Sequence, residues 1–480
     1  MEENKIDNLQ SGLIYDVIIV GGGISGLLSA LTLSKHGKKV LVLEKNDAVG
    51  GNCNSYMVDG FQVDTGPHAI THLREGPLRR LMDEYFTYLP FFVDYGHYYV
   101  RTEKGLTKIP SNIKDFVTFD VLPGKDRLML SQALTKALTQ MIFGMLDGDQ
   151  PVYDYIPKGL SEDTYDFVNA IAYFLSGKSM KDTSVNRVLY GSSFVRDSVS
   201  EDIFENVEET SGTSYASMIT DRLSKYQLKG HLTSLSRLAT NKVSYAQAYP
   251  RGGLRSLLKA VLYSMPETVQ IKTSSRVNTI STDGEKAIGV TTDIDSYSSD
   301  TIVYTGFVKN LPLLIELPPD YIKKLSTIDQ TLSLTVWLGL KEKMKEFDYT
   351  GSEVWFKGGA YWAMPISNYD ASIAPKGKQL VGFTFVIDDK NNIESEKKKA
   401  LDLIFRAVPC IENKIEMAHY QLTIPEKAAV TINGYFAGTR SPVRNLYLAG
   451  TDTDSRSMGV TRAAYSVLEM LKAMKEDKIL

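Results

Sequence analysis

Near the N-terminus, apolar positions form two short continuous runs with a longer helical stretch between them. Residues 14–20 are a largely β-branched run bounded by glycine, which is typical of a parallel strand buried on both faces. Leucines within residues 27–33 predict a helix with Gly37 as its C-terminal cap. Residues 40–43 predict a second buried strand that ends at Glu44.

The loop between the first strand and the helix matches the pattern G-x-G-x-x-G at Gly21, Gly23 and Gly26. In a dinucleotide-binding unit the first glycine permits a tight turn, the second lets the backbone approach a pyrophosphate, and the third lets the helix pack closely. Ile24 and Ser25 lie where N–H groups at the helix start face the phosphates. The motif alone could be an ordinary glycine turn. Here the strand, glycines, helix, second strand and terminal acid occur in order, which predicts dinucleotide binding.

Glu44 follows Gly26 by 18 residues, a spacing that suits an acid accepting hydrogen bonds from the adenosine ribose. No second G-x-G-x-x-G follows a later strand, since the glycine pairs at 252–253 and 358–359 are off pattern. A flavoprotein reductase that binds NAD(P) in a separate Rossmann domain would need two such motifs. We therefore expect one dinucleotide per chain, either NAD or FAD.

Three further blocks favour FAD, because they resemble the flavin amine oxidase superfamily. The Gly-Phe-x-x-Asp-x-Gly-Pro stretch at 60–67 is similar to the phytoene desaturase and carotenoid isomerase branch. The blocks are residues 44–68, 249–254 and 445–460. The resemblance implies one FAD per chain, and it is bound non-covalently because no cysteine lies where related amine oxidases carry a flavin thioether.

The resemblance also implies which residues contact FAD. Val277 would pass the adenine, and Gly459 and Val460 would begin a helix facing flavin N1 and O2. Asp452 would bind ribityl hydroxyls, with a turn or helix N-cap aspartate as the alternative. No catalytic acid or base is implied. The expected cofactor-binding residues are Gly21, Gly23, Ile24, Ser25, Gly26, Glu44, Lys45, Gly50, Gly51, Asn52, Gly66, Pro67, His68, Val277, Gly450, Asp452, Gly459 and Val460.

Asn52 departs from the pattern, because the family usually carries arginine directly after Gly50-Gly51. An amide can hydrogen-bond a phosphate but brings no positive charge. Either the pyrophosphate is held less tightly, or another cation compensates. Flavin-dependent mutases that act on sugar nucleotides can also have Gly-Gly-Asn at this point.

The resemblance implies an α/β fold (α+β overall) with a discontinuous Rossmann-type FAD-binding domain from residues 14–75, 246–310 and 425–480. Residues 76–245 and 311–424 would form a substrate-facing domain of helices and antiparallel sheet. Within it, apolar residues in 126–146 recur at helical spacing, as in a core helix or a membrane entrance. That stripe is Leu130, Leu134, Ala137, Leu138, Met141 and Met145.

Composition and charge exclude several classes of protein. The chain has 480 residues, 43% apolar and 23% charged, which is ordinary for a globular protein of two or three domains. A formal charge of −3 gives no basic footprint for nucleic acid. The two cysteines imply no disulfide framework and fit a reducing cytosol. His68 and His72 are four residues apart without a completing ligand set, so no metal is expected.

Residues 1–12 lack a signal-peptide pattern, and the uncharged run at 17–33 is interrupted by glycine and too short for a bilayer. We expect a cytoplasmic protein, with peripheral contact to the inner face of the membrane as an open alternative.

Three functions are compatible with these patterns. The first is an FAD-dependent oxidoreductase that moves hydride between flavin N5 and a carbon of an apolar isoprenoid or polyene, as a desaturase, saturase or isomerase would. The second is an amine or protoporphyrinogen oxidase. The third is a redox-neutral mutase or a non-catalytic FAD-binding protein. The sequence does not identify the electron acceptor.

Overall fold

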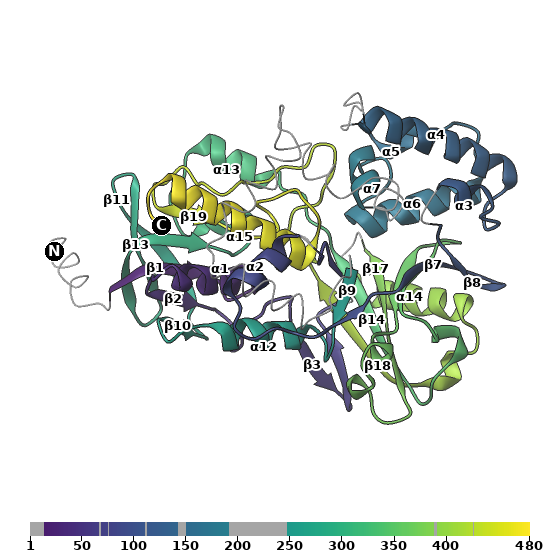
Figure 1. Ribbon diagram of the computed structural model, residues 1–480, viewed down its shortest axis with the longest axis horizontal. Helices are drawn as coiled ribbons and strands as arrows, with labels where there is room; N and C mark the ends of the chain where they lie inside the picture. The colour runs from purple at the N-terminus through teal and green to yellow at the C-terminus, as the bar shows by residue number, and fades with distance from the viewer. Residues whose placement is uncertain are drawn as a thin grey trace.

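The computed structural model describes residues 14–66, 69–74, 76–110, 113–142, 150–191, 247–387, 391–425 and 427–480. Two seven-stranded sheets organise these residues (Figure 1). The first sheet has the order β10-β2-β1-β13-β12-β11, with β19 paired to β13. Its strands are β1 (Ile14–Val20), β2 (Val40–Leu43), β10 (Val269–Lys272), β11 (Val277–Asp283), β12 (Lys286–Thr292), β13 (Ser296–Tyr304) and β19 (Leu446–Leu448).

The first sheet confirms the predicted strand, helix and strand at the N-terminus. β1 and β2 have the predicted bounds and run parallel, with Val17 paired to Val40 on one side and to Thr301 of β13 on the other. Alternate side chains of β1 enter different cores, since Val17 packs on one face and Ile18 on the other. The continuous apolar pattern of β1 therefore reflects burial on both faces.

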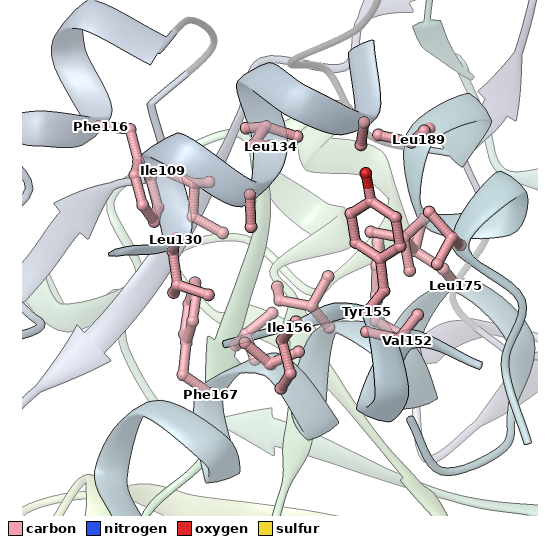
Figure 2. A pocket seen from close by; sticks show the side chains of 18 of the residues that line it. Ile109, Phe116, Leu130, Leu134, Val152, Tyr155, Ile156, Phe167, Leu175 and Leu189 are labelled. Carbon is pink, nitrogen blue, oxygen red and sulfur yellow. The ribbon is translucent and has the colours of Figure 1, made fainter. Parts of the chain in front are cut away.

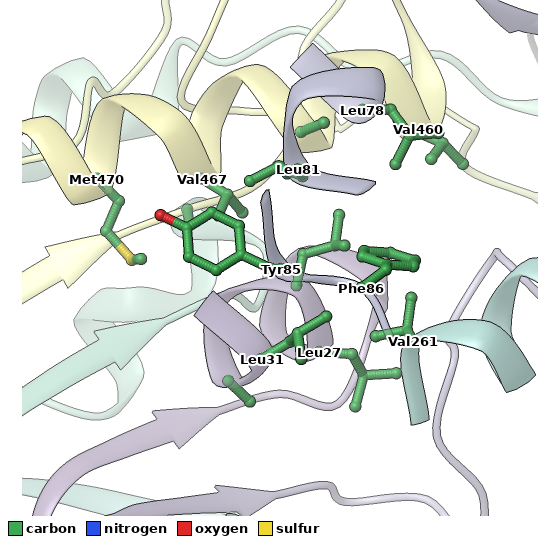
Figure 3. Close-up of a cluster of buried hydrophobic side chains, with 14 of the residues drawn as sticks. Leu27, Leu31, Leu78, Leu81, Tyr85, Phe86, Val261, Val460, Val467 and Met470 are labelled. Atoms are coloured by element: carbon green, nitrogen blue, oxygen red, sulfur yellow. The ribbon is translucent and has the colours of Figure 1, made fainter. Parts of the chain in front are cut away.

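Helices cover the first sheet on the face where Val17 packs, and Figure 3 shows their shared core. Leu27 and Leu31 of α1 meet Tyr85 of α2, Val261 of α12 and Val467 of α15. These helices are α1 (Ile24–Lys35), α2 (Pro77–Tyr85), α12 (Leu254–Ser264) and α15 (Gly459–Glu476). The opposite face is covered by η3 (Val308–Leu313) and α13 (Pro319–Ser326).

The second sheet has the order β18-β14-β17-β16-β15-β7-β8 and is largely antiparallel. Its strands are β7 (His97–Thr102), β8 (Gly105–Lys108), β14 (Ser333–Leu340), β15 (Gly351–Trp355), β16 (Tyr361–Met364), β17 (Gln379–Val386) and β18 (Ile415–Thr423). α14 (Ile393–Ala407) packs on one face of this sheet. A group of helices lies at the β7–β8 end (Figure 1), namely α3 (Ile113–Val117), α4 (Gly124–Ile142), α5 (Val152–Tyr155), α6 (Glu162–Ser176) and α7 (Val185–Gly191).

Small strands connect the two sheets. They are β3 (Ser55–Val58) with β4 (Phe61–Asp64), and β5 (Ile70–Thr71) and β6 (Phe92–Asp94) on either side of β9 (Gln247–Pro250). The sheets draw on separated parts of the chain, as expected for a discontinuous fold. The division of the chain at residues 75, 245, 310 and 424 stays a prediction.

Asp64 joins three of the connecting elements. Its Oδ1 accepts hydrogen bonds from Ser55 Oγ at 2.6 Å and from the Leu254 N–H at 3.2 Å, and its Oδ2 accepts one from the Tyr249 hydroxyl. The side chain is fully buried, and burial raises its pKa from 3.8 to about 6 against the opposing effect of the three hydrogen bonds.

The raised pKa makes the stability of the protein depend on pH at Asp64. Protonated Asp64 is favoured in the folded state, so its contribution is fully present below about pH 4 and is lost as the pH rises through about 6. A shift of about 2 units corresponds to about 3 kcal/mol. We expect Asp64→Asn to gain that amount relative to wild type between these pH values, measured as free energy of unfolding in urea. Parallel pH profiles for the two proteins would contradict the assignment.

Candidate functional site

The glycine loop after β1 is held against β2 and β13. Gly21 has φ +111°, and its N–H donates to the Leu43 carbonyl at 2.9 Å. An added Cβ at Gly26 would lie 2.0 Å from the Gly21 carbonyl oxygen, so α1 starts too close to the loop for any side chain there. The Thr305 hydroxyl, at the end of β13, donates to the same Gly21 oxygen at 2.9 Å.

Gly23 differs from its neighbours because an added Cβ would meet nothing within 4 Å. It is the N-cap of α1, which begins with Ile24 and has neither a side-chain cap nor an acidic residue in its first turn. Gly50 bridges to Gly23, and the Gly50 N–H donates to the Gly22 carbonyl at 2.8 Å. An open surface of backbone at a helix N-terminus suits a pyrophosphate. The residues present therefore fit the expected dinucleotide.

Glu44 lies beside this loop and is 7% exposed. Its Oε2 accepts from the Gly22 N–H at 2.7 Å and its Oε1 from the Asn46 N–H at 2.9 Å. The Ser275 N–H donates to the Glu44 carbonyl at 2.8 Å, which brings the start of β11, and with it Val277, toward the same end of the sheet. Lys45 is exposed. The predicted ribose and adenine contacts are thus close together.

Asp452 lies at the carboxyl end of β19 and is fully buried. Its Oδ2 accepts from the Val308 N–H at 2.7 Å, while its Oδ1 has no partner among the described residues. Burial raises the Asp452 pKa, against the opposing charge of Lys427. An added Cβ at Gly450 would lie 2.7 Å from Oδ1. One oxygen thus holds the loop after β13, and the other can accept from a ligand hydroxyl.

The remaining predicted contacts lie around the start of α15. This helix begins at Gly459 and continues with Val460, as predicted, and the Thr71 hydroxyl bonds those of Ser457 at 2.9 Å and Thr461 at 3.0 Å. The Gly66 N–H donates to Gln421 Oε1 at 3.1 Å. Pro67 and His68 lie outside the described residues. The contact between Gly66 and Gln421 of β18 was not predicted, because no local motif marks Gln421.

Asn52 lies at the exposed end of the Gly50–Gly51 turn. Its Nδ2 donates to the Ile424 carbonyl at 2.9 Å, across 372 positions of sequence. Asn52 thus fastens the glycine turn to the segment that follows β18. No motif or spacing in the sequence predicts this contact.

Neither a membrane span nor a metal cluster is found in the parts of the chain that the structure describes. No helix there has both the length and the apolarity to cross a bilayer. No group of three or more His, Cys, Asp and Glu side chains in the same residues is placed to hold a metal ion.

The second and third glycines of the motif give a matched test. Gly23→Ala puts a methyl into the open space where a pyrophosphate would lie, so we expect FAD affinity to fall more than about tenfold with little change in melting temperature. Gly26→Ala meets the Gly21 carbonyl and should cost more than about 2 kcal/mol of stability. FAD titration of deflavinated protein and thermal melts measure both effects. Full FAD affinity in Gly23→Ala would contradict the assignment.

Comparisons with known proteins agree with this geometry. The family described as flavin containing amine oxidoreductase matches residues 24–466. An uncharacterized protein of Methanothermococcus thermolithotrophicus is 57% identical over 102 residues, which are 21% of this chain and 98% of that protein. The all-trans-retinol 13,14-reductase of Rattus norvegicus is 43% identical over 72 residues, and the match spans 15% of this chain and only 12% of the reductase.

Solved structures share the fold at low sequence identity. An oxidoreductase from Methanosarcina mazei matches with a TM-score of 0.69 at 19% identity, over 96% of this chain and 100% of that one. This likeness shows the architecture, and the family match extends over nearly the whole chain. The chain therefore belongs to the flavin containing amine oxidoreductase family and is a flavin-dependent oxidoreductase.

Proposed function

We propose that the protein binds one FAD non-covalently and transfers hydride between flavin N5 and a carbon atom of an apolar isoprenoid or polyene. The observation that carries the substrate class is an apolar cavity of about 190 Å³ among the helices beside the second sheet. Figure 2 shows Leu130 and Leu134 of α4 on one side and Val152, Ile156 and Phe167 on the other.

The lining of the cavity favours a hydrocarbon. Among the described residues that line it, none is charged, and the only polar side-chain atoms are the hydroxyls of Tyr98 and Tyr155. Each hydroxyl already donates to a glutamine at 2.8 Å, Tyr98 to Gln247 and Tyr155 to Gln140. A cationic amine would leave its charge unpaired there, which is costly in an apolar environment. An isoprenoid chain has no such cost.

Tyr98, in the wall of the cavity, is linked to the cofactor side of the protein by a series of residue contacts. The partner of Tyr98, Gln247, begins β9, which also carries Tyr249, the residue bonded to Asp64. β9 in turn pairs with β5, whose Thr71 contacts the loop before α15. The cavity wall and the proposed flavin-binding end are thus joined by a short series of direct contacts.

Three features support FAD as the flavin and its non-covalent binding. Glu44 and the two glycine turns suit the adenosine and pyrophosphate, which a mononucleotide flavin lacks or has only in part. Cys53 is 2% exposed, and burial raises its pKa to about 12, so it stays a protonated thiol. Cys410 is exposed beside Glu346, near the second sheet.

When bound, the flavin would supply the hydride-accepting or hydride-donating atom, as cofactors do for redox chemistry. The chain's own residues bind and orient the reactants. Gly23 leaves space for the pyrophosphate, Asp452 Oδ1 can accept from a ribityl hydroxyl, and the apolar cavity excludes water from a hydrocarbon substrate. The name of one relative, all-trans-retinol 13,14-reductase, gives retinol as its substrate. Retinol is an isoprenoid, which agrees with this substrate class. A cytoplasmic location stays a prediction, with peripheral contact to the inner membrane face as its alternative.

Filling the cavity tests the proposal. Ala133→Phe on α4 places a ring in the cavity, whereas Leu128→Phe changes an exposed position of the same helix and serves as control. With retinol or a carotene in detergent, we expect Ala133→Phe to lower kcat/KM at least about tenfold while FAD content stays unchanged. Anaerobic flavin absorbance, followed from both the oxidised and the chemically reduced protein, covers both directions of reaction.

Other outcomes would reject the isoprenoid substrate or the cavity as its binding site. Flavin bleaching by amines but by no polyene would identify an amine oxidase. Turnover of a sugar nucleotide without net change in flavin would identify a mutase. Equal polyene turnover by wild type and Ala133→Phe would show that the cavity is not the substrate site.

A further inference from the structure

Ile424 and Lys427 contact opposite halves of the proposed cofactor site. At one end, the Ile424 carbonyl accepts the hydrogen bond from Asn52 Nδ2 at 2.9 Å. At the other end, Lys427 Nζ donates to the Thr305 carbonyl at 2.9 Å. The Lys427 N–H also lies 3.4 Å from Thr451 Oγ1. Ile424 thus contacts the Gly50–Gly51 turn, and Lys427 contacts the carboxyl ends of β13 and β19.

Thr305 places the Lys427 ammonium beside the glycine loop. The Thr305 N–H donates to the Val20 carbonyl at 2.9 Å, and its hydroxyl donates to the Gly21 carbonyl at 2.9 Å. These contacts lie where β1 and β13 end together, in parallel register. Thr305 therefore contacts both Lys427 Nζ and the glycine loop. In that loop, Gly23 leaves space that suits a pyrophosphate.

A space beside Gly450 is shared by Lys427 and Asp452. A Cβ built on Gly450 would lie 3.7 Å from Lys427 Nζ and 2.7 Å from Asp452 Oδ1. Asp452 is fully buried and Oδ1 has no partner in the described chain. An acceptor and an ammonium thus face the same position, where any residue other than glycine would place a side chain. This arrangement suits a ligand that carries both hydroxyl and anionic groups.

The ammonium of Lys427 keeps donors for such a ligand. An ammonium has three donors, and the structure gives Lys427 one neutral carbonyl acceptor. No carboxylate among the described residues lies within 4.0 Å of Lys427 Nζ, although the charge of Lys427 acts on Asp452 from farther away. The side chain is half-buried, so its charge is less screened than that of a surface lysine.

We propose that Lys427 is the cationic residue that binds the pyrophosphate of FAD, and that Asn52 positions it by binding the Ile424 carbonyl, three residues earlier in the chain. This assignment depends on the proposal that FAD is bound. It explains how the site supplies a positive charge to the pyrophosphate although residue 52 is an uncharged asparagine.

FAD binding to deflavinated protein tests the role of Lys427. We expect Lys427→Gln to weaken FAD binding by about tenfold to a hundredfold, a loss that shrinks as salt rises. Lys427→Arg keeps the charge and should recover most of the affinity. Lys309→Gln is the control, because Lys309 lies at the same end of the sheet and donates to the Ile328 carbonyl. Riboflavin, which lacks phosphate, should bind wild type and Lys427→Gln equally.

Position 52 gives a second comparison. Asn52→Ala frees the Ile424 carbonyl and should weaken FAD binding by only several-fold, because Lys427 is displaced but still present. Asn52→Arg should give no tighter binding in the wild-type background, where the charge is already supplied. In the Lys427→Gln background the same change should recover affinity.

A measurement on the wild type covers the case in which Lys427→Gln folds poorly. An amine-acylating reagent followed by mass spectrometry should modify Lys427 without cofactor, and FAD should protect it while leaving Lys309 reactive. Equal FAD affinity in Lys427→Gln and wild type, or no protection, would overturn the role of Lys427 alone. A wild-type protein that binds no FAD would instead overturn the proposed cofactor.

Discussion

The close contact of α1 with the loop after β1 sets the geometry of the whole cofactor side. Only glycine fits at position 26, because a Cβ there would lie 2.0 Å from the Gly21 oxygen. The Thr305 hydroxyl donates to that oxygen and so links it to β13. The contact fixes the start of α1 over the ends of the parallel strands. Glu44, the Gly50–Gly51 turn and the Gly450 end of β19 then converge there, because parallel strands end at one edge of a sheet.

The second sheet is held against this edge by buried polar contacts as well as apolar packing. Gln421 of β18 donates to the Asp64 carbonyl at 2.8 Å and accepts from the Trp337 indole at 3.0 Å and from the Gly66 N–H. Buried amides with satisfied donors and acceptors fix the relative position of the groups they join. The loop at Gly66 is thus held by the second sheet, which suits a boundary between cofactor and substrate.

Local sequence patterns predicted the N-terminal strand, loop, helix and second strand. They did not predict contacts between residues far apart in the sequence. The β-branched run of β1 and the glycine spacing depend on neighbours in the sequence, so strand, loop and helix followed directly from residues 14–43. Asn52 and Ile424 are 372 positions apart, and Lys427 and Thr305 are 122 apart, so no periodicity or motif could pair them. The apolar stripe on α4 was predicted as core or membrane entrance. Leu130, Leu134 and Ala137 of that stripe line a cavity, whereas Met145 lies outside the described residues.

The residues that line the cavity are unevenly distributed along the chain. All its described lining residues fall between Tyr98 and Leu189 except Val354, whereas Gly23, Glu44 and Asp452, which suit the dinucleotide, come from the two ends of the chain. One continuous stretch of the chain thus supplies almost all of the described side chains that line the cavity. Under the proposed function, exchange of that stretch for the corresponding one of a relative would change the accepted molecule and leave the residues that suit the dinucleotide unchanged.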